Sequence, residues 1–331
     1  MPKVSVIIPN YNHMRFLEQR IRTVLNQTYQ DFEIIYLDDA STDNSNEVFA
    51  KFADNPQIRA IYNQTNSGSP FKQWNKGVRH ANGEYIWIAE SDDYADKRLL
   101  AELVDRLDNN PMVGIAYCQS WVVDEYGNTK CNCKEWLDSS ERERWEKDFI
   151  NIGKKECEQL IIKNTIPNAS AVLIRRSIYE EVGYADESMI LSGDWLLWAK
   201  MLLISDIAFM VEPLNYFRAH SGTVSHKNYR NGVYVEETYR VLQYIINNIE
   251  MSKKVVEQAC ERIGERWVST IFSEDCEITW ERNCRIYKIG SNVDSTLKLR
   301  LLKKIFIRWL RLFTPVFIMF RYIKRNIAII K

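Results

Sequence analysis

The order of apolar and polar residues divides the first part of the chain into short apolar runs and segments with helical spacing. Lys3–Pro9 and Phe32–Leu37 are nearly continuous apolar runs, as in strands that are covered on both faces of a parallel sheet. Between them, apolar residues recur with helical period over residues 16–25. The pattern also predicts a helix over residues 99–110 and a strand over Val113–Val123. Strands that alternate with helices predict an α/β fold with a mostly parallel, Rossmann-like sheet flanked by helices.

Other segments give less regular patterns. Residues 58–62 and 169–174 are strand-like, and a short helix is expected around residues 78–82, before an apolar strand. Residues 63–77 are polar and contain Gly and Asn, so we expect a loop there. Residues 130–155 are charged and lack a clear period, which favours an insertion or a flexible loop over the binding site.

Long helical segments begin near Tyr229. We therefore expect an α/β domain in residues 1–226 and a helical C-terminal region in residues 227–331. Over residues 302–313, apolar side chains fall on one side of a helical wheel and Lys and Arg on the other. Pro315 ends this helix, and no apolar run reaches the roughly 20 residues that are needed to span a bilayer.

The net charge of zero hides an asymmetry. Residues 295–331 contain ten Lys or Arg and no acid, which leaves 34 basic and 44 acidic residues in the rest of the chain. A basic amphipathic tail predicts contact with an anionic membrane surface. The alternative is an ordinary helix docked on the body, and nucleic-acid binding is disfavoured because the apolar face is large. Since the first strand starts without a targeting segment, we expect a cytoplasmic protein, peripheral at the inner face of the membrane.

Three predicted strands end in polar clusters, which are Pro9–Asn12, Asp38–Asp43 and Glu90–Asp93. Ligands of parallel α/β sheets bind at the carboxyl ends of the strands, so these clusters predict a pocket. The carboxylates of the third cluster are ligands that Mg²⁺ or Mn²⁺ prefers, although they could instead cap the next helix. No Gly-rich dinucleotide or ATP motif and no zinc-site spacing is present, which disfavours those classes of protein.

In their order and spacing, four motifs resemble the family 2 glycosyltransferases, whose nucleotide-sugar-binding fold is called GT-A. They are Val6–Asn12, Asp38–Asp43, a pattern of Asn, Gly, Ala and Glu over residues 66–84, and Glu90–Asp93. The resemblance covers roughly residues 3–222. It implies a GT-A domain, here with a helical C-terminal extension, in an enzyme of the type that builds bacterial surface polysaccharides.

By this resemblance, Pro9, Tyr11 and Asp39 line the nucleotide pocket. Tyr11 offers a face on which the base can stack, and Asp39 offers an acceptor for a pyrimidine N–H. The alternatives are a packing role for Tyr11 and a helix cap for Asp39. The nucleotide-binding candidates, which include two lysines as phosphate partners, are Pro9, Tyr11, Asn12, Asp38, Asp39, Asn66, Lys72, Lys76, Glu90 and Ser91.

The resemblance also implies an Asp-x-Asp metal motif, which reads Glu90-Ser91-Asp92 in this chain. We expect Asp92 to contact Mn²⁺ or Mg²⁺ directly, with Asp93 in support. Such an ion would neutralise the charge of the leaving diphosphate.

A later segment, Tyr216–Ser225, resembles the family's Tyr-Arg-x-His motif. Its His220 is expected to coordinate the metal or contact the diphosphate, with a structural role as the alternative. Arg218 holds either a phosphate or a structural carboxylate. The other histidines, which we expect at the surface or in packing, are His13, His80 and His226.

The family's catalytic base is commonly the Asp of a Glu-Asp pair near the start of a late helix, and that place reads Gly193-Asp194 here. A carboxylate within hydrogen-bond reach of the acceptor hydroxyl serves as a general base, and we assign that role to Asp194. The alternative is that Asp194 caps the helix that it begins.

These assignments predict an inverting, metal-dependent glycosyltransferase of the hexosyl- or N-acetylhexosaminyl-transferring class. Its donor is expected to be a nucleotide-diphosphate sugar, foremost a UDP-sugar, and its acceptor the hydroxyl of a lipid-linked or polysaccharide glycan. Because Glu90 and Gly193 depart from the family's motifs, the alternative is a non-catalytic nucleotide-sugar-binding subunit that recruits a partner enzyme. Nucleotidyl transfer is disfavoured, since the Gly-rich N-terminal loop expected for triphosphates is missing.

Overall fold

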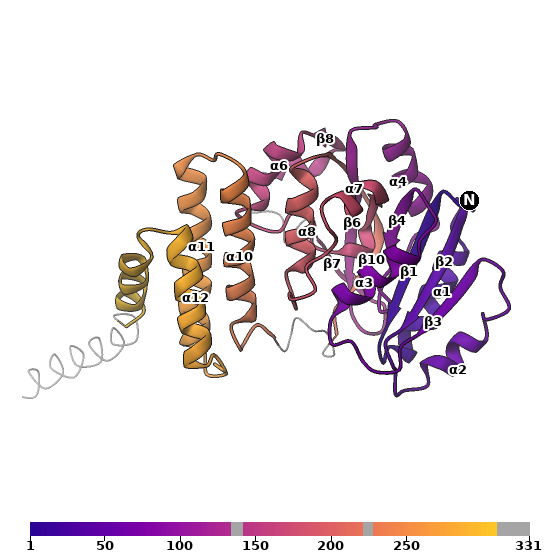
Figure 1. Ribbon diagram of the computed structural model, residues 1–331, viewed down its shortest axis with the longest axis horizontal. Coiled ribbons are helices and arrows are strands. Elements are labelled where there is room, and N and C mark those ends of the chain that lie inside the picture. The colour runs from indigo at the N-terminus through magenta and orange to yellow at the C-terminus, as the bar shows by residue number, and fades with distance from the viewer. Residues whose placement is uncertain (134–141, 221–227, 310–331) are drawn as a thin grey trace, which may run out of the picture.

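The computed structural model describes residues 1–133, 142–220 and 228–309 (Figure 1). The strands are β1 (Val4–Asn10), β2 (Phe32–Asp38), β3 (Ile58–Tyr62), β4 (Tyr85–Ile88), β5 (Tyr94–Ala95), β6 (Val113–Val123), β7 (Thr129–Asn132), β8 (Phe149–Asn151), β9 (Val172–Arg175) and β10 (Asp206–Arg218). The α-helices are α1 (Met14–Leu25), α2 (Ser45–Ala50), α3 (Pro70–His80), α4 (Leu99–Asp108), α6 (Gly153–Leu160), α7 (Arg176–Glu181), α8 (Gly193–Leu202), α10 (Val233–Asn248), α11 (Lys253–Ile271) and α12 (Trp280–Val293). Short 3-10 helices are η1 (Arg142–Glu146) and η2 (Ala169–Ala171), and residues 297–309 are also helical.

The strands form one sheet in the order β3-β2-β1-β4-β9-β6-β10-β5, with β7 paired to β6 and β8 paired to β10. The four strands β3, β2, β1 and β4 run parallel, as the apolar runs predict. β9 lies antiparallel between β4 and β6, so the sheet as a whole is mixed. The chain moves outward from β1 in both directions, to β2 on one side and to β4 on the other. The carboxyl ends of β1 and β4 therefore lie at a topological switch point, where ligands of such sheets bind.

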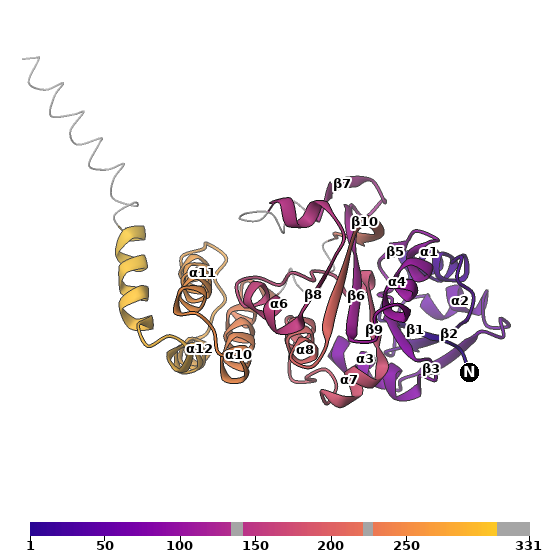
Figure 2. The same ribbon diagram turned by 90° about the horizontal axis from the view of Figure 1, so that it is seen from above.

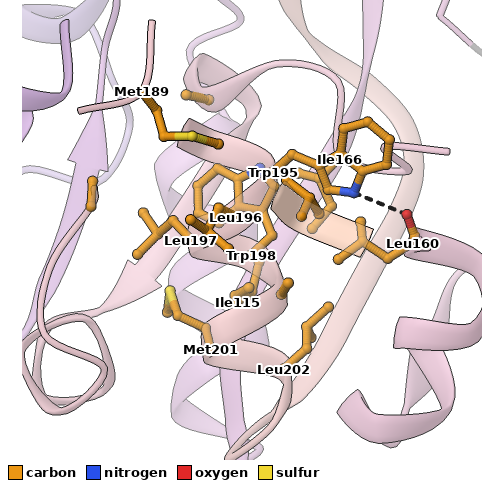
Figure 3. Close-up of a cluster of buried hydrophobic side chains, with 14 of the residues drawn as sticks. Ile115, Leu160, Ile166, Met189, Trp195, Leu196, Leu197, Trp198, Met201 and Leu202 are labelled. Carbon is orange, nitrogen blue, oxygen red and sulfur yellow. Dashed lines mark hydrogen bonds between the residues drawn. The ribbon is translucent and has the colours of Figure 1, made fainter. Parts of the chain in front are cut away.

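Helices cover both faces of the sheet, which explains the continuous apolar runs. Successive side chains of a strand point to opposite faces. Val6 and Ile8 of β1 pack in one buried cluster with α1 and α4, whereas Ile7 belongs to a second cluster with α3 and α8. Figure 3 shows the part of this second cluster around α8, in which Trp195, Trp198 and their neighbours are buried.

Helices α10, α11 and α12 pack beyond α8 (Figures 1 and 2). Leu242 of α10 and Ile263 and Trp267 of α11 belong to the same buried cluster as α8. The C-terminal helices thus share a core with the α/β part of the chain. The predicted boundary after residue 226 lies at residues 221–227, outside the described residues, and stays a prediction.

The expected loop over residues 63–77 is wrong in its second half, because α3 already begins at Pro70. Gln73 and Asn75 of this helix are buried although they are polar, so its sequence lacks a clean apolar stripe. Gly77 allows close packing on β1, since a Cβ there would lie 2.4 Å from Cγ2 of Ile7. Lys72 and Lys76 consequently lie on a helix.

The expectation of an irregular insertion over residues 130–155 is also wrong for the described part of that segment. It contains β7, η1 and β8, and β8 pairs antiparallel with β10. Trp145 is buried and meets Phe209 of β10 edge to face, with 5.2 Å between ring centroids. The segment is therefore held to the sheet edge by an aromatic contact.

The helix over residues 297–309 packs on α11 through its basic side. Arg300 and Lys304 both pair with Glu261 of α11. Its apolar side chains remain exposed, among them Leu302, Phe306 and Trp309, of which half or more of the surface is accessible. The rest of the predicted amphipathic segment, with Pro315, lies outside the described residues. No helix within the described residues has the length and apolarity needed to cross a bilayer.

Candidate functional site

A pocket of about 310 Å³ lies at the carboxyl ends of β1, β2 and β4. Several predicted nucleotide-binding residues line it together, namely Pro9, Tyr11, Asp39, Asn66, Glu90 and Ser91. Tyr11 is 45% exposed, so its ring is available to a ligand in the pocket. The sequence motifs thus converge at the switch point of the sheet.

Asp39 is buried at the floor of this pocket and is held by several donors. Its Oδ1 accepts hydrogen bonds from the Ser67 amide at 2.9 Å and from Nε2 of Gln73 at 2.9 Å, as well as from the Asn63 side chain. Its Oδ2 accepts from Oγ of Ser67 at 2.7 Å. Since a carboxylate oxygen has two lone pairs, Oδ2 retains room for one further donor, such as a pyrimidine N–H.

Three buried polar atoms of the pocket lining have no hydrogen-bond partner among the described residues. They are Oδ1 of Asn10, Oγ of Ser69 and Oε1 of Gln73. A buried polar atom without a partner costs about 1–3 kcal/mol. Unpaired atoms gathered around one pocket therefore indicate a site built for a polar ligand.

Two predicted nucleotide-binding residues, Asn12 and Asp38, hold the turn at residues 41–43 instead of lining the pocket. Oδ1 of Asn12 accepts hydrogen bonds from the Thr42 amide at 2.7 Å and from the Asp43 amide at 3.2 Å. Oδ2 of Asp38 accepts from the Ser41 amide at 2.9 Å. These hydrogen bonds fix the turn beside the loop that carries Tyr11 at the rim of the pocket.

Lys72 and Lys76, the predicted phosphate partners, lie on α3 and donate to the loop before it. Nζ of Lys72 is 3.1 Å from the carbonyl oxygen of Ser67, and Nζ of Lys76 donates to the Asn63 side chain. Neither lysine lines the pocket. Both stabilise the loop that surrounds Asp39.

Beside the pocket, His13, Asp92 and His220 bring ligand atoms within 4.8 Å of one another. Nε2 of His220 is 3.0 Å from Oδ2 of Asp92, and Nδ1 of His13 is 2.8 Å from Oγ of Ser91. Burial alone would raise the pKa of Asp92, but the hydrogen bond with His220 and the charge of His13 hold it below its usual range. Two imidazoles and one carboxylate suit Mn²⁺ better than Mg²⁺, which prefers oxygen ligands.

Asp93 faces the protein and does not join this group. Its Oδ1 accepts from the Arg218 amide at 2.8 Å, and its Oδ2 lies 3.9 Å from the buried guanidinium of Arg20. Burial and the charge of Asp92 raise the pKa of Asp93 to about 6. The guanidinium of Arg218 donates to the backbone oxygens of residues 92, 124 and 125, so it contacts structural carbonyl groups.

Glu90, at the first position of the altered metal motif, points at α3. Its Oε1 accepts a hydrogen bond of 2.7 Å from the indole N–H of Trp74. Burial raises the pKa of Glu90 to about 8, and the charge of Asp92 adds to this effect. The extra methylene relative to Asp lets this carboxyl reach Trp74 while it still lines the pocket.

Asp194 is the second residue of α8 and is half-buried. Its Oδ1 accepts from the Trp195 amide at 2.7 Å, and its Oδ2 lies 3.4 Å from Nδ2 of Asn164. Burial raises the pKa of Asp194 to about 7, with a further contribution from the charge of Glu237. A carboxylate with a pKa near neutrality is suited to accept a proton from a hydroxyl.

Gly193 explains why the family's Glu is missing from this place. A Cβ on Gly193 would lie 2.5 Å from Cε2 of Phe71, a buried ring of α3. No side chain fits there unless Phe71 moves. The Glu that the resemblance implies therefore has no room at residue 193, where α3 packs directly against the start of α8.

Glu237 of α10 holds the loop that leads into α8. Its carboxylate accepts from the amides of Ile190, Leu191 and Ser192 at 2.6, 2.8 and 2.7 Å. Ile190 also lines the pocket at β1 and β4. The C-terminal helices thereby fix the position of Asp194 relative to that pocket.

Sequence reasoning missed His13, Gln73 and Glu237. His13 follows the first motif directly, and its position one residue beyond the Pro9–Asn12 cluster was a usable signal. Gln73 was not recognised as a pocket residue because its segment was predicted to be a loop. Glu237 gives no local signal, since its partners lie more than 40 residues away in the chain.

The sheet order, the pocket at its switch point and the adjoining acidic cluster define the GT-A class of glycosyltransferase folds. The family model described as Glycosyl transferase family 2 matches residues 5–183 of the chain. The chain therefore belongs to that family. The predicted family and the predicted fold class are confirmed. The chain is thus a glycosyltransferase.

Among curated proteins, the chain is 25% identical over 228 residues to an uncharacterized glycosyltransferase of Rickettsia typhi, covering 68% of this chain and 66% of that one. It is 28% identical over 274 residues to an uncharacterized glycosyltransferase of Nostoc, and this match covers 79% of this chain and 77% of the Nostoc protein. The chain thus spans about two thirds of the length of the Rickettsia relative.

Among solved structures, S. aureus TarS in complex with UDP-GlcNAc matches with a TM-score of 0.67 at 18% identity, covering 92% of this chain and 89% of that chain. The mannosyltransferase PcManGT of Pyrobaculum calidifontis, in complex with GDP-Man and Mn²⁺, matches with a TM-score of 0.57 at 15% identity. This match covers 92% of this chain and 87% of the PcManGT chain. At these identities the matches establish a common fold.

Proposed function

We propose that this glycosyltransferase uses a UDP-sugar and transfers the sugar, with inversion, to an acceptor hydroxyl of a glycan or a lipid-linked glycan. The main observation behind the proposal is the pocket at β1 and β4. Three buried polar atoms around Asp39 in this pocket have no hydrogen-bond partner among the described residues. Tyr11 at its rim provides a stacking face for a base. The fold shared with a UDP-GlcNAc complex supports a uridine donor.

In the proposed reaction, the acceptor oxygen forms a bond to the anomeric carbon of the donor. The bond between that carbon and the diphosphate oxygen breaks, and the nucleoside diphosphate leaves with the electron pair. The hydroxyl proton passes to the carboxylate of Asp194, whose pKa of about 7 keeps a useful fraction ionised at neutral pH. Attack from the side opposite the leaving group inverts the anomeric centre.

The metal in this proposal is Mn²⁺, held by His13, Asp92 and His220. The convergence of two imidazoles and one carboxylate fits such an ion. When bound, the ion supplies charge neutralisation for the leaving diphosphate. Asp93 holds the backbone amide of Arg218, and Glu90 accepts a hydrogen bond from the Trp74 indole.

We also propose that the helix over residues 297–309 meets an anionic membrane surface from the cytoplasmic side. Its exposed apolar side chains, Leu302, Phe306 and Trp309, support insertion among headgroups. The test is cosedimentation with phosphatidylglycerol vesicles. Replacing these three residues by Ser should release the protein, whereas Trp280→Ser on α12, which changes another exposed Trp, should not. Unchanged vesicle binding by the triple variant would overturn the membrane role.

The test of the transferase proposal is release of nucleoside diphosphate from UDP-, GDP- and dTDP-sugars with Mn²⁺ or Mg²⁺. We expect slow hydrolysis of a UDP-sugar that depends on Mn²⁺ and falls strongly in Asp92→Asn. Lys97→Gln, on the exposed surface, is the control. Binding of a donor without turnover, also after addition of membrane lipid extract, would instead favour the non-catalytic, partner-recruiting subunit.

A further inference from the structure

A second and larger pocket, open to solvent, lies beside the start of α8. It has a volume of about 550 Å³ and is formed by the start of α8, by α10 and α11, and by the segment after α6. Its buried lining includes the apolar side chains of Trp195, Leu242 and Ile263, together with Thr238. In Figure 3, the indole of Trp195 donates to the carbonyl oxygen of Leu160 at 2.9 Å, which fixes this wall. The pocket is therefore a preformed feature of the core.

This pocket adjoins the proposed catalytic base. Trp195 lines it and follows Asp194 directly, and its amide donates to the Asp194 carboxylate at 2.7 Å. Tyr229 also lines this pocket, and burial raises the pKa of its hydroxyl. The donor pocket does not include any of these residues. The second pocket is thus separate from the donor pocket, and its wall includes the residue that hydrogen-bonds the Asp194 carboxylate.

The rim of the second pocket is cationic. Arg262 and Arg266 lie one turn apart on α11, both are exposed, and neither has an ion-pair partner within the described part of the chain. The Arg266 guanidinium lies over the ring of Tyr229 at 5.0 Å, which holds it above the pocket. Glu265 also lines the rim, but its carboxylate lies 4.0 Å from Lys304. The planar guanidinium group binds phosphate oxygens in a bidentate way, and the helix places two such residues one turn apart at this rim.

We infer that this pocket is the acceptor subsite and that it takes an acceptor bearing a phosphate group, which Arg262 and Arg266 bind. The inference rests on the proposed function, since it assigns the acceptor of that same reaction. The aromatic walls suit the rings or chains of a glycan or polyol, and the arginines select its charge. The phosphate could belong to a polyol-phosphate chain or to a diphosphate that links a sugar to a lipid.

The experiment uses the full-length protein with UDP and Mn²⁺ in excess, so that the donor pocket is filled. Isothermal titration measures binding of two phosphate probes, a short glycerol-phosphate oligomer and a polyprenyl-diphosphate-linked N-acetylhexosamine. The matched neutral probes are a polyol of the same length and an alkyl glycoside of the same sugar. The variant is Arg262→Gln/Arg266→Gln, and the control is Lys253→Gln/Lys254→Gln, which removes the same charge from exposed positions of α11 away from the pocket.

We expect at least one phosphate probe to bind about tenfold or more tightly than its neutral counterpart, and the arm that responds identifies the source of the phosphate. That preference should disappear in the arginine variant, persist in the lysine control and weaken with added salt. Equal binding of charged and neutral probes, no binding of either phosphate probe, or equal loss in both variants would overturn the inference. UDP-sugar hydrolysis without acceptor should stay unchanged in the arginine variant, whereas its absence in the wild type would contradict the proposed function itself.

Discussion

Replacement of Asp194 by Asn should abolish transfer and at the same time make the protein more stable at alkaline pH. The first effect follows because an amide cannot accept the acceptor proton, and general-base catalysis contributes about 10²–10⁴-fold. The second effect, on stability, follows because folding buries the carboxylate of Asp194. In the unfolded chain the pKa of this carboxyl is near its ordinary value of 3.8, whereas burial raises it to about 7 in the folded chain.

The sign of the pH effect follows from proton uptake. Between pH 4 and pH 7 the folded chain binds the Asp194 proton more tightly than the unfolded chain, so this group lowers stability as the pH rises through that window. The full pKa difference would amount to about 4 kcal/mol above pH 7, and partial solvent access at this half-buried site reduces it to on the order of 1–2 kcal/mol. Asn avoids this penalty at every pH.

The assay combines two measurements on the same variant. The rate of sugar transfer by the wild type should fall about tenfold per pH unit below pH 7 and level off above it. The Tm of Asp194→Asn should exceed that of the wild type by a few degrees at pH 8, and the difference should shrink towards pH 4. A variant that retains transfer, or that loses stability at pH 8, would refute the assignment of Asp194 as a buried base.

Three further substitutions test the surroundings of the two pockets. His13→Ala should raise the Mn²⁺ concentration needed for half-maximal turnover at least tenfold, whereas an unchanged Mn²⁺ titration would exclude it as a ligand. Gly193→Ala should lower the stability by about 1–3 kcal/mol in a urea titration, because its Cβ would meet a buried ring, while Gly264→Ala on α11 should be close to neutral. Glu237→Gln should shift the midpoint of the pH–rate profile to lower pH, because it removes a negative charge that raises the pKa of Asp194. An unmoved midpoint would limit Glu237 to a purely structural role.

The parallel half of the fold could be predicted because its strands are buried on both faces. β1 and β2 are continuous apolar runs for that reason. β10 escaped prediction because Glu212, Pro213 and Asn215 interrupt its apolar residues, and its pairing with β6 shifts register at these positions. The first part of α3 was assigned to a loop because Gln73 and Asn75 are polar residues that are buried in the pocket and the core. Buried polar residues interrupt the helical spacing of apolar residues from which a helix is predicted.

The residues that line the proposed donor pocket could be predicted from the sequence better than their individual contacts. Pro9, Tyr11 and Asp39 stand at strand ends, where the topology alone brings them to one edge of the sheet. The roles of Asp92 and Asp93, in contrast, could not be separated from their order in the chain. Adjacent residues point in different directions, and only the fold shows that Asp92 meets His220 while Asp93 meets the backbone of Arg218.

The C-terminal helices connect the donor pocket, the base and the second pocket. Glu237 of α10 binds the loop before Asp194, and α10 and α11 form most of the second pocket. Phe71 of α3 excludes a side chain from Gly193, so α3 packs directly against the start of the helix that carries Asp194. A helical region that only attached the enzyme to a membrane would need neither of these contacts. These contacts agree with the inferred acceptor role of the second pocket, since α10 contacts the loop before Asp194 and α3 packs against the start of its helix.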